Sequence, residues 1–151
     1  MKHTGMTPIV KNVARLVTGF ITVFAIYIAL TGHLTPGGGF AGGVILAAAA
    51  ALLLLSFGRE GSGRLISESA CHVADSAGAT AFLVIGVLGY LAGTFFANFV
   101  ELGTLHRLVS GGAIPLSNLA ILVKVGGGLA GGLLALSAFH LVRRIAHRYE
   151  P

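Results

Sequence analysis

Long apolar stretches separated by short polar segments dominate this chain. Residues 16–58 and 76–100 contain no Asp, Glu, Lys or Arg, and residues 108–142 contain Lys124 alone. A helix needs about 20 apolar residues to cross the hydrocarbon core of a bilayer. The first stretch is long enough for two crossings joined by a turn. The pattern therefore predicts four spanning helices in a single membrane domain covering 1–151, at about 13–30, 40–57, 77–100 and 118–142.

Composition supports the same fold class. Of 151 residues, 55% are hydrophobic and 10% are charged, whereas an ordinary soluble domain has about 25% charged residues. A soluble core in so short a chain could not bury this much apolar surface. The single cysteine, Cys71, excludes a disulfide scaffold within the chain. We expect an all-α integral membrane protein, a bundle of four transmembrane helices.

The basic residues are distributed unevenly along the chain. Eight Lys and Arg flank the spans at the two termini and in the central loop, one lies in 101–117, and none lies in 31–39. The positive-inside rule then predicts that both termini are cytoplasmic, in the cell membrane of a bacterium or archaeon. These residues are suited to contact anionic membrane lipids. We expect no nucleic-acid binding and no cleaved signal peptide.

The turn between the first two spans is rich in glycine. It contains Gly32 and His33, followed by the string Pro36, Gly37, Gly38, Gly39 and Phe40. Proline stops a helix, and glycines let the chain reverse direction. One interpretation is a tight external hairpin. The other is a polar mouth for an ion, formed by His33 and by the amides that begin the second helix.

The last span combines Lys124 with several glycines. A lysine at the middle of a membrane helix costs about 2.5–3.5 kcal/mol, unless its side chain reaches the headgroups. Helical spacing places Lys124 on a close-packing face with Ser117, which favours a buried lysine that exchanges protons or balances a carboxylate. Small residues four apart allow helices to approach closely, so we expect packing, within the bundle or against another subunit, at Gly127, Gly128, Gly131 and Gly132.

The third predicted span carries a polar stripe: Tyr90, Thr94, Asn98 and Glu101 recur at helical spacing. It is interpreted either as the lining of an ion path beside Lys124 or as interhelical hydrogen bonding. All acidic residues are expected at or beyond the span ends, so no carboxylate is predicted inside the membrane. The histidine spacing predicts neither a metal site nor a haem, and no cofactor or enzymatic activity is expected.

The string from Gly32 to Gly43, between two N-terminal spans, resembles the Pro-Gly-Gly-Gly-Phe signature of the MnhB/MrpB family. The motif positions run from Pro36 to Phe40. The resemblance is specific over about residues 13–58 and extends to the four-span layout. It implies an MrpB-type hydrophobic subunit of a multisubunit Mrp-type Na⁺/H⁺ antiporter. The partners would be the other hydrophobic subunits, and the transported ions Na⁺ and H⁺.

Several functions remain open from the sequence. The principal expectation is an antiporter subunit that contributes to assembly and, as a hypothesis, to the ion pathway. The alternative is the equivalent subunit of a membrane-bound hydrogenase or complex I-like respiratory complex. A free-standing homo-oligomeric transporter is less favoured, because no carboxylate is expected inside a span. A purely structural scaffold is a further interpretation.

Overall fold

The computed structural model describes residues 6–62, 66–100 and 110–149, with the main chain alone at 59–60 and 139–149. These described residues form four long helices and one short 3-10 helix. They are α1 (Pro8–Leu30), α2 (Gly39–Ser62), α3 (Glu68–Leu88), η1 (Gly89–Ala92) and α4 (Ile114–Tyr149). Four segments are long and apolar enough to cross a membrane. The prediction of an all-helical bundle with four candidate spans is therefore confirmed.

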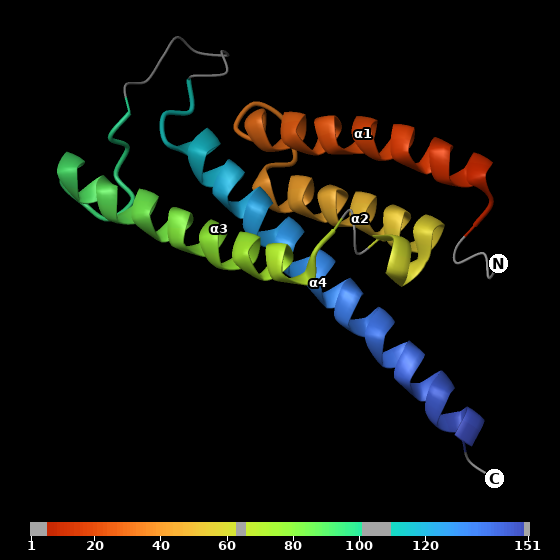
Figure 1. The fold of residues 1–151 in the computed structure, drawn as a ribbon. Coiled ribbons are helices and arrows are strands. Elements are labelled where there is room, and N and C mark those ends of the chain that lie inside the picture. Colours follow the sequence, from red (N-terminus) through yellow and green to blue (C-terminus); the bar gives the residue numbers. More distant parts are fainter. Residues whose placement is uncertain (1–5, 63–65, 101–109, 150–151) are drawn as a thin grey trace.

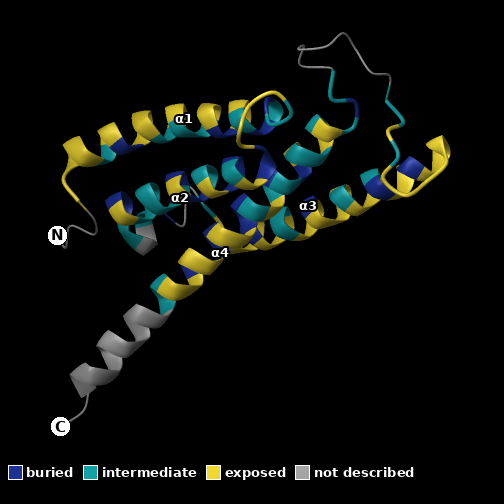
Figure 2. Cartoon of the chain, turned by 180° about the vertical axis from the view of Figure 1, so that it is seen from behind, coloured by how far each residue is buried: buried dark blue, intermediate teal, exposed yellow. Residues whose placement is uncertain are grey.

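Helix α4 lies at the centre of the bundle. It crosses diagonally between the antiparallel pair α1 and α2 on one side and α3 on the other (Figure 1). Both α2 and α3 pack along α4, whereas α1 packs on α2 and touches α4 less. In the described ranges, no close main-chain approach joins α3 to α2. Buried residues follow the crossing of α2 and α4, and the outer surface of α1 is exposed (Figure 2).

Glycines permit the helices to approach this closely. A side chain at Gly43 would lie 2.6 Å from the Val125 Cβ atom on α4. A side chain at Gly78 would lie 2.6 Å from the Lys124 amide nitrogen. These distances are shorter than atoms tolerate, so the small residues set the spacing of α2 and α3 on α4.

The third helix is where the sequence-based boundaries were wrong. The span was expected at 77–100, but α3 begins at Glu68 and η1 ends at Ala92. Beyond η1 the chain folds back, and the Phe96 amide donates a hydrogen bond to the Gly86 carbonyl. The Phe96 ring packs against Phe82 at a centroid distance of 5.1 Å. The absence of side chains at Gly86 and Gly89 leaves room for this return.

Of the other helices, α1 and α4 extend beyond their predicted bounds, whereas α2 keeps to them. Helix α1 begins five residues earlier than the expected 13–30, because Pro8 is tolerated in a first helical turn. Helix α4 extends the expected 118–142 in both directions. Helix α2 agrees with the expected 40–57, since non-helical torsion angles at Gly58 (φ 70°) kink it there.

Candidate functional site

An ion pair joins α3 to α4 within the candidate spans. The Lys124 Nζ atom lies 3.0 Å from the Asp75 Oδ1 atom. Asp75 is seven residues from the start of α3 and Lys124 ten residues from the start of α4, or about 10 and 15 Å along the two helix axes. The contact is an ion pair without hydrogen-bond geometry, since no hydrogen bond reaches the solvent-shielded Oδ1 within the described residues. The distances of about 10 and 15 Å from the helix starts place both charges away from those ends.

Asp75 corrects a prediction made from the sequence. All acidic residues were expected at or beyond the span ends, but Asp75 lies inside the candidate span Glu68–Ala92. The error arose because the charge-free stretch was taken to mark the helix. A charged side chain is tolerated there when its partner comes from the neighbouring helix. The chain thus has a carboxylate inside a candidate span, and it is paired with the lysine that the sequence singled out.

The ion pair is open on one side. The exposed fraction is 50% for the Lys124 side chain and 38% for that of Asp75. Lys124, Gly128 and Gly132 recur every four residues, so they form one stripe along α4, which we call the open stripe. A side chain at Gly128 would lie 3.0 Å from the Asp75 carboxylate, and nothing described lies within 4 Å of one at Gly132. The open stripe is available to another molecule.

The other glycines of α4 lie within the bundle. A side chain at Gly126 would meet Leu46 of α2, and one at Gly127 would meet Ala74 of α3 at 2.9 Å. Gly131 makes only an ordinary contact with the Cys71 Cβ atom, at 3.4 Å. Adjacent glycines of α4 therefore contact different helices. The spacing of small residues in the sequence did not indicate which glycine contacts which helix.

The glycine-rich turn closes around Asn118 of α4. Side chains at Gly32 and Gly39 would both collide with Asn118 atoms, and Gly38 (φ 99°) lies in contact with the Asn118 amide. Asn118 was not identified from the sequence, because its partners are distant in the chain. Phe40, the last residue of the motif, is exposed, with 66% of its surface accessible. The turn thus packs around one polar residue of the central helix, Asn118.

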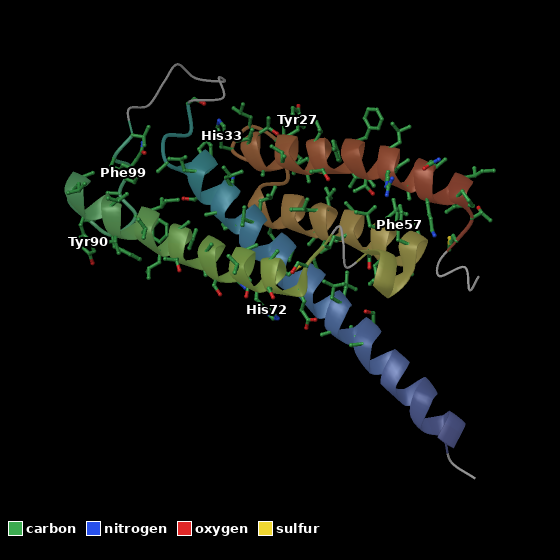
Figure 3. The ribbon with its side chains drawn as sticks, viewed as in Figure 1. Tyr27, His33, Phe57, His72, Tyr90 and Phe99 are labelled. Carbon is green, nitrogen blue, oxygen red and sulfur yellow. The ribbon has the colours of Figure 1, made fainter. Side chains whose placement is uncertain are left out.

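His33 and Asn98 each lie near the beginning of α4. The Asn98 Oδ1 atom accepts a hydrogen bond from the Ala113 amide at 2.9 Å, one residue before α4 begins. His33 lies at the end of α1 beside this helix start (Figure 3), and its ring packs on Gly111. A cavity of about 350 Å³ lies here. Its lining consists of Phe96, Asn98, Ser110, Gly111, Ala113, Ile114 and Ser117.

The structure does not support the polar stripe expected on the third span. Tyr90 lies in η1 with its ring 5.9 Å from that of Phe95, and Thr94 lies in the turn that follows. Asn98 lies in irregular chain after η1, and Glu101 lies outside the described residues. Helical spacing no longer applies because the helix has ended. The three described residues of the stripe therefore share no helical face beside Lys124.

Metal binding finds no support in the part of the chain that the structure describes. No group of three His, Cys, Asp or Glu side chains there is arranged to hold an ion. His72 lies near the start of α3 and Tyr90 at its opposite end (Figure 3). The ion pair is the candidate functional feature, because two opposite charges in contact can balance each other and can exchange a proton or a cation.

Known proteins resemble this chain over most of its length. An uncharacterized protein of Methanocaldococcus jannaschii is 33% identical over 138 residues, covering 87% of this chain and 52% of that protein. The chain thus spans about half the length of this curated relative. A chain in the structure of the membrane-bound sulfane sulfur reductase (MBS), an archaeal respiratory membrane complex, superposes with a TM-score of 0.74 at 32% identity. That match covers 89% of this chain and 59% of the other.

A family match extends well beyond the glycine-rich turn. Residues 9–131 match the family described as a domain related to the MnhB subunit of Na⁺/H⁺ antiporter. This range includes the turn, both members of the ion pair and four of the five glycines of α4, with Gly132 just beyond it. The resemblance first seen in residues 13–58 is confirmed over most of the sequence, and the chain belongs to the MnhB family.

Proposed function

We propose that this chain is a subunit of the ion-translocating membrane part of a multisubunit respiratory complex. The observation that carries the proposal is the superposition on a chain of such a complex, with a TM-score of 0.74 at 32% identity. A similarity this close in both sequence and fold favours a shared mode of assembly. The alternative expected from the sequence, a subunit of a respiratory complex, is therefore favoured over a subunit of an antiporter.

The open stripe supports a subunit over a free-standing transporter. Lys124 and Asp75 are partly exposed at a depth where lipid offers no hydrogen bonds. A neighbouring protein surface or internal water would solvate them better than hydrocarbon. Gly132, next on the stripe, has room for a helix to approach. Partners that complete this face are the other hydrophobic subunits of the complex.

A Mrp-type Na⁺/H⁺ antiporter is the second candidate, and the description of the matching family favours it. The free-standing transporter was first disfavoured because no carboxylate was expected in a span. Asp75 removes that argument, and the likeness to a complex subunit replaces it. In both leading candidates the chain itself is not the catalytic subunit, and Na⁺ and H⁺ are the candidate ions.

We infer that the Asp75–Lys124 pair lies beside the ion path. A pair of opposite charges can take up or release a proton or cation when its spacing changes, because each charge sets the affinity of the other for H⁺. Vesicle transport with Lys124→Met tests this inference. Transport should fall by at least tenfold with the complex still assembled, and wild-type transport would refute a place in the path.

The subunit role is tested by isolating the native complex through a tag on this chain and identifying its components by mass spectrometry. Redox subunits would support the respiratory complex, and antiporter subunits alone would support the second candidate. Gly132→Leu should release the partners, because it fills the open stripe. Gly19→Leu, at another glycine with nothing described within 4 Å, is the matched control. Retention of all partners by Gly132→Leu would refute docking at this stripe.

A further inference from the structure

A groove runs between α1, α2 and α3 on the side of α4 away from the open stripe. Its volume is about 340 Å³, at the lower end of the range for ligand pockets. Apolar and small side chains form most of its wall, including Leu46, Ala49, Leu53 and Ala70. The groove exists because α3 packs on α4 without a close main-chain approach to α2. It has the chemistry of a hydrocarbon site.

One edge of the groove is polar. Thr18 and Thr22 of α1 both line it. The Thr22 hydroxyl donates to the Thr18 carbonyl at 2.9 Å and is satisfied. The Thr18 hydroxyl is buried and has no hydrogen-bond partner among the described residues. A buried hydroxyl without a partner is costly, so the groove offers one donor that a ligand could satisfy.

Two cations lie just beyond this edge. Lys11, Arg15, Thr18 and Thr22 recur at spacings of three and four residues, which places them along one side of α1. The Arg15 guanidinium lies 4.9 Å from the centroid of the Phe57 ring, and the Lys11 ammonium lies 5.7 Å from it. Phe57 projects between the ends of α1 and α2 (Figure 3). The ring thus holds both cations at the end of the groove.

Positive charge, a hydroxyl donor and an apolar channel follow one another along about 16 Å of α1 between Lys11 and Thr22. We propose that the groove binds one acyl chain of an anionic phospholipid, whose phosphate is held by Lys11 and Arg15. The Thr18 hydroxyl donates to the ester carbonyl, which in a phospholipid lies between the phosphate and the acyl chain. A partner helix would have no reason to present an anion, an acceptor and hydrocarbon in this order.

Native mass spectrometry of the full chain in detergent tests the site, with phosphatidylglycerol and phosphatidylcholine of identical acyl chains as probes. Phosphatidylglycerol should be retained preferentially. Lys11→Gln combined with Arg15→Gln should weaken its binding roughly 30-fold. The charge-conserving Lys11→Arg with Arg15→Lys should retain it. Equal retention of both lipids, or no loss on removing the two charges, would overturn the proposal.

The groove and the hydroxyl are tested separately from the charges. Ala70→Phe introduces a ring from an exposed position of the groove wall and should abolish binding, whereas Ala79→Phe, on the same helix outside the groove, should not. Thr18→Val should weaken binding about two- to tenfold. Thr80→Val, on α3 outside the groove and with its hydroxyl donating to the Ser76 carbonyl, is its matched control. If Ala70→Phe instead displaces a subunit of the native complex and leaves the lipid bound, the groove holds a protein helix and the proposal fails.

Discussion

The Asp75–Lys124 ion pair makes a double-mutant prediction. Lys124→Met and Asp75→Asn each remove one charge with little change in side-chain size. At 3.0 Å the Coulomb attraction is roughly 5 kcal/mol at an effective dielectric constant of about 20. Partial exposure of both side chains reduces the net effect. A single variant leaves the other charge unpaired within a membrane helix, which costs about 2.5–3.5 kcal/mol.

The double variant leaves no unpaired charge. We therefore expect each single variant to lower the Tm of the purified chain in detergent by about 5–10 °C, and the double variant to be no less stable than either single variant. The coupling free energy would be about 2–3 kcal/mol. Ser76→Ala, at the exposed neighbouring position, controls for the effect of a substitution in α3 that removes no charge. Additive losses in the double variant would refute the energetic coupling of the two charges.

Three further predictions concern the close contacts of α4. Gly39→Ala should destabilise the chain by about 1–3 kcal/mol, because its methyl group meets the backbone of α4; Gly19→Ala, in open space, should be neutral or stabilising in the same thermal scan. Asn98→Ala should cost about 0.5–2 kcal/mol by removing the acceptor at the start of α4, while Asn98→Asp should restore it. Gly78→Val should separate α3 from α4, and cysteine crosslinking across this contact should then fail; efficient crosslinking would contradict the role of Gly78.

Hydropathy predicted the number of helices correctly because each span must bury about 20 apolar residues in lipid. It placed α3 wrongly because absence of charge is an indirect sign of a span. Asp75 is tolerated inside α3 through Lys124, which is far away in the chain. Asn118 was missed for the same reason, because the turn that packs around it lies some 80 residues earlier in the sequence.

The sequence identified Lys124 only through the free-energy cost of placing a charge within a membrane helix. A single charge in a long apolar stretch has few explanations. The sequence could not identify the partner. The four residues expected to accompany Lys124 were grouped by a helical period that holds only while the helix continues. Gly89 and Gly93 were available as signs of an ending, but glycines also occur within α4 without ending it. Packing, rather than local preference, decides between these outcomes.

The ion pair also has a consequence for biosynthesis. Asp75 emerges from the ribosome 49 residues before Lys124, so α3 reaches the membrane while its carboxylate has no counterion. Releasing that helix alone into lipid would cost about 2.5–3.5 kcal/mol. Leaving the translocon together with α4 avoids that cost, because the two charges then enter the bilayer as a neutral unit. We therefore expect the pair to couple the insertion of α3 and α4, so that α3 leaves the translocon only once α4 is present.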